Sequence, residues 1–395
     1  MKIKKKFILF KNKQFLSRQL FLTASILFLM IVNSFAQQKN FVDKTLDWSY
    51  KIIQGDSAHP HTKYFFPILF LSYKPETRWI LGVSLTQLFR SKNNDSITRP
   101  SAIRLNTSYS QNDQFSIRTF GEVYTNKNKF DLNGLVQYTN FVENFWVKGI
   151  QSPDVYQTYF FKLVKINFKG SYQLLPNFYC GIQYNLENMF DLNYSTSNID
   201  MKSSGEPGTL SNGSISSGTG FVIEYDDRNN VFSPTKGQDI ELSNCLYNSV
   251  FGSGSNFHNI TFDARKYIAL WKENVLAIQA FANVNSGNVP FRLMGTLGSD
   301  SYMRGYYNGR FRDNCAMAFQ TELRKTIWGP VSIVAFGGFG TVSSDVTGLT
   351  SNLKPNYGGG LRIKAVPKEK FNIRIDYGMG IDGASAFYVT MGEAF

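Results

Sequence analysis

A hydrophobic period of two residues constrains this chain more than any other feature, and it runs from about residue 63 to the last residue. In Phe371-Asn-Ile-Arg-Ile-Asp-Tyr-Gly-Met379, apolar side chains occupy the odd positions, and polar side chains or glycine occupy the even ones. This is the period of a β-strand with two unlike faces. Periodicity alone allows a soluble sandwich with apolar faces inside, or a membrane barrel with its apolar face outside.

Composition favours the membrane barrel. Only 18% of the residues are charged, against about 25% in a typical soluble domain. The mean hydropathy of −0.22 is too low for a bundle of membrane helices, whereas alternation dilutes the apolar residues of a barrel in this way. The net charge of +13 does not indicate a nucleic-acid partner, because seven basic residues lie within residues 1–36, which hold no acid, and the rest of the chain carries +6.

The N-terminus has the pattern of a secretory signal peptide. A basic region precedes an apolar stretch of 13 residues, Leu20 to Val32, and small residues follow at Ser34 and Ala36. We predict cleavage after Ala36; the alternative is an uncleaved membrane anchor, although the apolar stretch is shorter than the roughly 20 residues of a spanning helix. Residues 37–62 are predicted to be a short periplasmic segment, too small for a folded domain.

Residues 63–395 are predicted to form an all-β, sixteen-stranded antiparallel transmembrane barrel, an even number as bacterial barrels require. Turn signals such as Lys74-Pro75-Glu76 and Asp382-Gly383 separate most of the strands. The predicted strands are 63–73, 79–90, 101–111, 114–125, 129–140, 158–173, 176–190, 213–226, 237–250, 256–270, 274–287, 313–326, 330–342, 355–366, 370–380 and 384–395.

Connection lengths agree with this assignment. If the first strand runs outward, the long connections 141–157, 191–212, 288–312 and 343–354 all lie outside the cell. Most connections on the periplasmic side are then short, which is the usual asymmetry of outer-membrane barrels. Residues 91–100 and 227–236 are the exceptions.

The second exception carries a motif. Tyr225-Asp-Asp-Arg-Asn-Asn-Val-Phe-Ser-Pro-Thr-Lys-Gly237 resembles a periplasmic turn of the BamA/TamA superfamily, the bacterial surface-antigen barrels. Pro234 and Gly237 would fix a tight backbone there, and Asp226 and Asp227 would accept backbone N–H groups beside Arg228.

A second segment, Leu297 to Asp313, resembles the family's V-R-G-F/Y loop, with Met303 in place of valine. The resemblance implies an extracellular loop that folds back into the barrel. Arg304, Gly305 and Tyr306 would form its tip, and Arg304 would pair with Glu322, which the alternation places on the lumen face. The family's second acid has no counterpart, since Gly338 stands at its position. We therefore expect one of two anchors to be missing.

The last residues resemble the targeting signal that the barrel-assembly machinery recognises on its clients. Its alternating positions are Phe387, Val389, Met391 and Phe395. Glu393 breaks the alternation, close to the chain end, where a charge in a barrel costs only about 0–1 kcal/mol.

The resemblance implies a barrel of the bacterial outer membrane that assists protein insertion or translocation. The chain has no room for the periplasmic POTRA domains that collect clients in the family, so we expect a partner protein to supply that step, besides the assembly machinery during biogenesis. Two alternatives stay open: a plugged channel whose conductance rises when Arg304 or Glu322 is replaced by alanine, and a surface protein that binds through residues 191–212.

Catalysis, cofactors and metals find little support in the sequence. The histidines His59, His61 and His258 lie outside any catalytic pattern, so we expect no enzyme, no cofactor and no metal site. The three cysteines are far apart and odd in number, which argues against a disulfide framework. Lumen-facing charges such as Arg362, Lys364, Arg374 and Asp376 would tune ion selectivity or form a solvated wall, and the wall is favoured.

Overall fold

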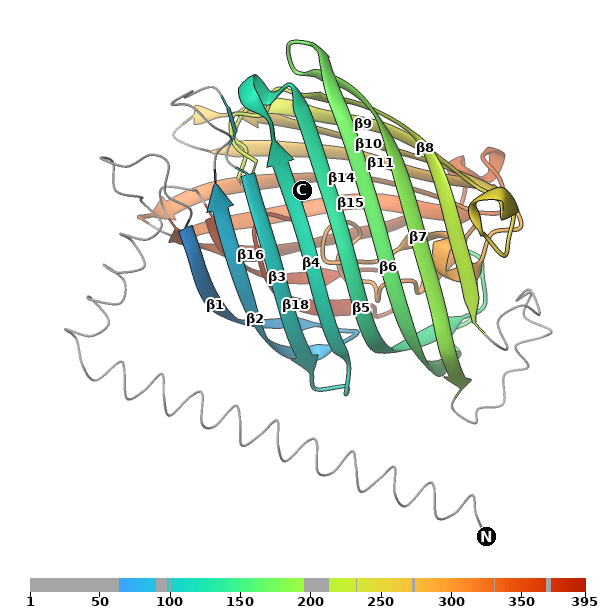
Figure 1. Ribbon diagram of the computed structural model, residues 1–395. Coiled ribbons are helices and arrows are strands. Elements are labelled where there is room, and N and C mark those ends of the chain that lie inside the picture. Colours follow the sequence, from blue (N-terminus) through green and yellow to red (C-terminus); the bar gives the residue numbers. More distant parts are fainter. Residues whose placement is uncertain are drawn as a thin grey trace.

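The computed structural model describes residues 64–89, 98–99, 101–194, 213–231, 233–271, 274–329, 331–366 and 371–395. Sixteen strands close an antiparallel barrel, as predicted (Figure 1). The predicted signal peptide 1–36 and segment 37–62 lie outside the described residues. Within the described part of the chain, no helix is long and apolar enough to cross a membrane.

The strands follow one another around the wall in sequence order, except that β14 pairs with β11. Their bounds are β1 Tyr64–Lys74, β2 Arg78–Phe89, β3 Ser101–Ser110, β4 Phe115–Tyr124, β5 Phe130–Trp146, β6 Tyr156–Leu175, β7 Phe178–Tyr194, β8 Ser214–Asp226, β9 Gly237–Tyr247, β10 Phe257–Ala269, β11 Val275–Gly287, β12 Gly295–Leu297, β13 Phe311–Asp313, β14 Cys315–Trp328, β15 Val331–Ser343, β16 Lys354–Val366, β17 Phe371–Met379 and β18 Ser385–Met391. The described residues also form four short 3-10 helices between strands: η1 Asn126–Asn128, η3 Ser249–Phe251, η5 Phe291–Leu293 and η6 Thr347–Thr350.

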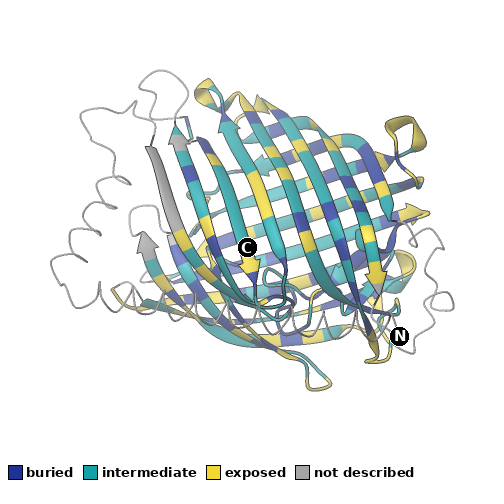
Figure 2. Ribbon diagram, turned by 60° about the horizontal axis from the view of Figure 1, so that its bottom comes forward, coloured by how far each residue is buried: buried dark blue, intermediate teal, exposed yellow. Residues whose placement is uncertain are grey.

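The two faces of the wall differ as a membrane barrel requires. Large apolar side chains such as Leu323, Leu361 and Phe221 point outward and are exposed. Their neighbours along the strands point inward and include buried polar residues such as Gln320 and Asn356. Figure 2 shows the resulting alternation of exposed and buried residues along the strands. An exposed apolar outer belt around a polar interior indicates contact with lipid.

The connections divide the barrel into two unlike ends. The terminal end, as we call it, contains the start of β1 and the residues that follow β18; its connections include the β8–β9 turn. The opposite loop end contains the long β5–β6, β7–β8, β11–β14 and β15–β16 connections. The predicted separation of long and short connections is therefore present.

The fold differs from the sequence-based expectation in several places. β5 ends at Trp146 and β7 at Tyr194, whereas ends at 140 and 190 were predicted. The β11–β14 connection, residues 288–314, contains a hairpin of β12 and β13 that is separate from the barrel sheet. Strands of three residues are too short to show a period in the sequence. The last strand ends at Met391, whereas a strand to residue 395 was predicted, because the residues after it turn into the barrel.

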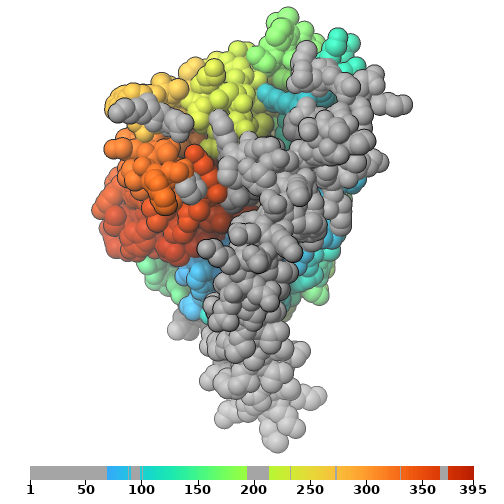
Figure 3. Space-filling view, turned by 90° about the vertical axis from the view of Figure 1, so that its left-hand side faces the viewer, coloured from blue at the N-terminus to red at the C-terminus, as the bar shows by residue number. Residues whose placement is uncertain are grey.

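The seam between the first and last strands is the weakest join in the wall. β1 pairs with β2 over its whole length, from Tyr64 to Lys74, and β18 pairs with β17 over its whole length, from Ser385 to Met391. Between β1 and β18 there is one registered pair, Tyr73 with Val389. The Ser72 hydroxyl adds a bond of 2.6 Å to the Val389 carbonyl. Figure 3 looks at the terminal end, where the blue first and red last parts of the wall meet.

Candidate functional site: a charged cluster and a loop inside the barrel

The lumen loop, residues 288–314, fills part of the barrel interior. At its tip, Met303, Arg304 and Tyr306 are all buried. Met303 has φ 53° and Gly305 has φ 113°, so the backbone turns sharply on either side of Arg304. Because the tip is buried and its backbone turns tightly, the Arg304 side chain lies against the inner face of the wall formed by β14 to β17.

Arg304 lies between two carboxylates. Its guanidinium is 2.7 Å from Glu322 on β14 and 2.6 Å from Asp376 on β17, and all three side chains are 0% exposed. The guanidinium also stacks on Phe336 of β15, with its carbon 3.5 Å from the ring centre. Nη1 of Arg304 donates a hydrogen bond to Asp376, and Glu322 faces the guanidinium as an ion pair. A buried cation needs such opposite charges beside it.

Asp376 corrects the expectation that one of two anchors is missing. The position of Gly338 has no space for a side chain, because a Cβ there would lie 2.4 Å from the Phe319 carbonyl oxygen. Its neighbour on β16, Asn356, instead donates a hydrogen bond of 3.0 Å to the Arg304 carbonyl. The second carboxylate comes from β17, two strands further round the wall.

Arg304 belongs to a larger set of buried charges, which we call the lumen cluster. It contains four arginines and four carboxylates: Arg304, Arg324, Arg362 and Arg374 with Asp300, Glu322, Asp376 and Glu393. The four arginines and four carboxylates balance one another, and Lys74 of β1 adds a further positive charge beside Asp300. Each carboxylate contacts at least one arginine of the cluster, so a change to one member leaves an opposite charge unpaired in a buried site.

Asp300 is the member of the cluster nearest the seam. It lies 3.0 Å from Lys74 of β1 and 3.2 Å from Arg374 of β17. Burial alone would raise the pKa of the Asp300 carboxyl, but Lys74 and Arg374 outweigh it and hold that pKa below its usual value. Asp300 is therefore ionised at neutral pH.

Gly305 allows the loop tip to touch the wall. A Cβ on Gly305 would lie 2.8 Å from the Met379 nitrogen, and one on Gly378 would lie 2.6 Å from the Arg304 carbonyl carbon. The Gly305 N–H donates to the Tyr388 hydroxyl at 3.1 Å. The Tyr306 hydroxyl donates to the Pro355 carbonyl at 2.8 Å. The predicted tip residues Arg304, Gly305 and Tyr306 thus lie together against β16 to β18.

We expect Gly305→Ala to destabilise the protein more than Gly149→Ala. Both glycines have nearly the same positive φ, 113° and 114°, so both substitutions strain the backbone. Only Gly305 has atoms within contact distance of the new methyl group. The difference should therefore be about 1–3 kcal/mol, the usual cost of overpacking, measured by denaturant unfolding in lipid vesicles. Equal losses in the two variants would contradict the close approach.

A second anchor on the opposite wall was not foreseen from the sequence. Arg292 lies 2.8 Å from Glu143 of β5 and 3.1 Å from Glu187 of β7, and it stacks on Phe161 at 4.6 Å. Beside it, Phe291 packs into a buried cluster of the same wall. The lumen loop is thus held to β5–β7 at its start and to β14–β18 at its tip, so that it crosses the barrel interior.

The predicted periplasmic turn is built around its own acids. Asp226 accepts bonds from the Arg228 backbone and guanidinium, and it pairs with Arg99 at 2.8 Å. Asp227 accepts the Gln238 N–H at 2.6 Å. Gly237 has φ 99° and no space for a Cβ, which would lie 2.5 Å from the Asp227 carbonyl oxygen. Pro234 is buried, and its carbonyl accepts a bond from Arg324 of the lumen cluster.

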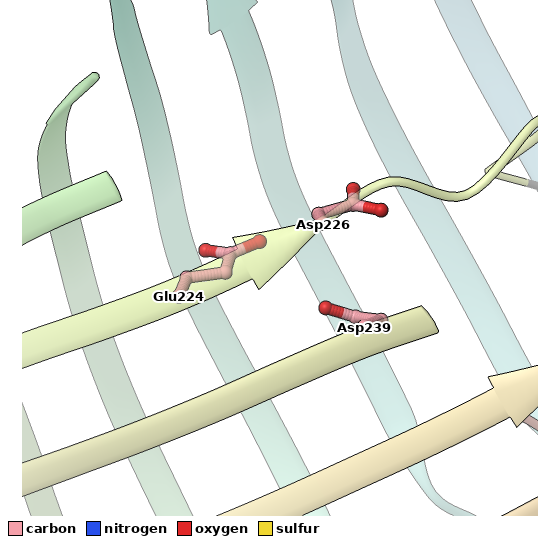
Figure 4. Close-up of side chains that lie close together, drawn as sticks. All are labelled: Glu224, Asp226 and Asp239. Atoms are coloured by element: carbon pink, nitrogen blue, oxygen red, sulfur yellow. The ribbon is translucent and has the colours of Figure 1, made fainter. Parts of the chain in front are cut away.

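Three carboxylates beside this turn come close together. Oxygens of Glu224, Asp226 and Asp239 lie within 4.8 Å of one another (Figure 4). Each is neutralised by a cation: Lys169 contacts Glu224, and Arg228 contacts both aspartates. Because basic side chains contact all three carboxylates, the group forms a network of ion pairs at the terminal end.

The predicted targeting residues are divided between the two faces of the barrel. Phe387 and Met391 of β18 are exposed on the outer face, and Val389 is half-buried beside them. Phe395 is buried inside, where it packs with Tyr267, Val275 and Ala277. Whether these residues act as a targeting signal stays a prediction.

The expectation that Glu393 is a tolerated charge near the chain end is wrong. It faces the lumen and pairs with Arg362 at 2.7 Å, with its side chain 4% exposed. Burial would raise the pKa of the Glu393 carboxyl, but Arg324 and Arg362 lower it below its usual value. These ion pairs draw the residues after Met391 inward.

Comparisons with known proteins agree with this geometry. A model of the Omp85 superfamily domain matches residues 98–395. BamA from Haemophilus ducreyi lacking POTRA domains 1–3 aligns at 14% identity over 84% of this chain and 70% of its own, with a TM-score of 0.57. CdiB from Escherichia coli aligns at 9% identity over 82% of this chain and 62% of its own, with a TM-score of 0.55. CdiB from Acinetobacter baumannii aligns at 11% identity over 82% of this chain and 59% of its own, with a TM-score of 0.50. No curated protein matches the chain.

Proposed function

Because the chain belongs to the Omp85 superfamily, we propose that it resides in the bacterial outer membrane and assists the insertion or translocation of other proteins there. The terminal end would face the periplasm and the loop end the outside, as in other barrels with short periplasmic turns. A periplasmic or membrane partner would collect the clients. The protein would act as a template and passage, without enzymatic chemistry.

One observation carries this proposal: the seam has a single registered pair, Tyr73 with Val389, in a wall whose flanking ladders run the full length of β1 and β18. Opening such a seam would break few backbone hydrogen bonds. It would then expose unpaired edges on β1 and β18, and an exposed strand edge is a template for pairing with another strand. A client strand added at this edge would enter the membrane already paired.

Depletion of the protein tests this role in the cell. Loss of several unrelated barrels or surface lipoproteins from the outer-membrane proteome, together with capture of assembly factors by the intact protein, is the expected result. An unchanged proteome and no captured factor would favour a channel for small solutes instead.

A disulfide across the seam gives a sharper prediction. Cysteines at Tyr73 and Val389, in a background without the native cysteines, would have Cα atoms about 4.5–5.5 Å apart, within the range that a disulfide needs. The oxidised variant should lose its assembly activity, and a reductant should restore it.

The matched control places cysteines at Phe262 and Ala282, which pair between β10 and β11, away from the seam. This second disulfide should leave the activity unchanged. Full activity of the oxidised Tyr73–Val389 variant would show that the function does not need an open seam.

A further inference from the structure

The seam has too few backbone bonds to explain by itself why the barrel is closed. The described side chains of β1 and β18 give, beside the one registered pair, one side-chain hydrogen bond and a ring contact between Tyr73 and Phe387. Other contacts must therefore help to hold the two edges together. The lumen loop, residues 288–314, contacts both sides of this join.

On the β1 side, the loop makes two polar contacts. Asp300 pairs with Lys74 at the end of β1, with 3.0 Å between the Asp300 oxygen and the Lys74 nitrogen. The backbone N–H of Asn308 donates to Glu76, in the β1–β2 turn, at 2.7 Å. Glu76 is buried, so the second bond is shielded from water.

On the other side of the seam, the same loop contacts β17 and β18. The second carboxylate oxygen of Asp300 lies 3.2 Å from Arg374 of β17. Gly305 donates its N–H to Tyr388 of β18 at 3.1 Å. The two oxygens of Asp300 therefore contact strands on opposite sides of the seam, Lys74 on one side and Arg374 on the other.

We propose that the lumen loop holds the seam closed, and that Asp300 links β1 to β17 across it through Lys74 and Arg374. We call this link the clasp. This role differs from that of Arg304, whose partners all lie on β14 to β17, on one side of the seam. The clasp rests on the proposed function in one respect. If the seam opens during protein insertion, movement of the lumen loop would be what allows it to open. A protein that displaced the loop would loosen β1 from β18.

Amide hydrogen exchange of the full chain in lipid nanodiscs tests the clasp. Asp300→Asn keeps the side-chain shape but removes the charge that both cations contact. We expect the amides of β1 and β18 to exchange about tenfold faster, because bonds to charged groups are among the stronger contacts of a fold, while the β5–β6 ladder keeps its protection. Lys74→Gln removes only the more exposed of the two contacts and leaves the Asp300–Arg374 contact in place. It should raise exchange of the same amides by a smaller factor, at most about fivefold, because water screens a partly exposed pair.

Asp154→Asn is the matched control. Asp154 pairs with Arg310 of the same loop at 3.3 Å, but it lies on the β5–β6 connection and is largely exposed. Unchanged exchange at the seam in both Asp300→Asn and Lys74→Gln would overturn the clasp, and so would an equal gain in exchange around the whole barrel. A loosened seam in a protein without assembly activity would leave the clasp standing and contradict the proposed function. Assembly activity together with unchanged exchange at the seam in both variants would support the proposed function and overturn the clasp.

Discussion

Glu322→Gln should lower the free energy of unfolding by about 3–5 kcal/mol, the cost of removing one partner from a buried ion pair. Glu322 lies 2.7 Å from Arg304, 2.8 Å from Arg324 and 3.4 Å from Arg362, and its side chain is 0% exposed. The substitution keeps the shape but leaves four arginines facing three carboxylates. Guanidinium unfolding in lipid vesicles, followed by tryptophan fluorescence, measures the loss.

The same substitution at Glu241 is the control. Glu241 also faces the lumen and pairs with Lys169 at 3.0 Å, but its side chain is 35% exposed. Water screens a pair of this kind, so the expected loss is at most about 1 kcal/mol. Equal losses in the two variants would mean that the lumen cluster behaves like a solvated wall, as the sequence suggested for its lumen-facing charges.

The fold could be predicted from the sequence because each strand carries the pattern that determines it. The two faces of every strand meet different media, so each strand carries its own alternation, as Phe371 to Met379 shows. Turn residues then separate the strands. The hairpin of β12 and β13 was missed because it is held by tertiary contacts, such as Leu297 packed with Met303 and Phe311, which leave no period in three residues.

The site was predictable only in part, because its members come from several strands. The loop motif indicated Arg304, and the alternation placed Glu322 on the lumen face of β14. Neither signal says which carboxylate on another strand lies across the lumen, and so Asp376 was not assigned to Arg304. The inward-facing acids Asp376 and Glu143 could have been proposed as candidates, but their pairing with Arg304 and Arg292 depends on how the loop crosses the barrel.

Simultaneous loss of both loop anchors should open a pore that neither single loss opens. Arg292 holds the start of the loop to Glu143 and Glu187, and Arg304 holds its tip to the opposite wall. Removing one anchor disfavours the bound loop by about 3 kcal/mol, a factor of roughly 100 in population, and the remaining anchor still keeps the loop in the lumen. In planar bilayers, Arg292→Ala with Arg304→Ala should give stable open channels, whereas each single variant should give rare openings.

Asn308→Ala is the control, because Asn308 belongs to the same loop, its side chain is exposed, and its backbone bond to Glu76 is kept. Combined with Arg304→Ala it should behave like Arg304→Ala alone. If Arg304→Ala conducts as much as the double variant, Arg292 does not anchor the loop. If the double variant stays silent although protease cleaves its loop, something other than the loop closes the lumen, and the solute-channel alternative loses its basis. A conducting double variant would show that the wild-type barrel is a pore kept shut by charge pairs on two opposite walls. A function at the seam would then require the loop to move while the lumen stays closed.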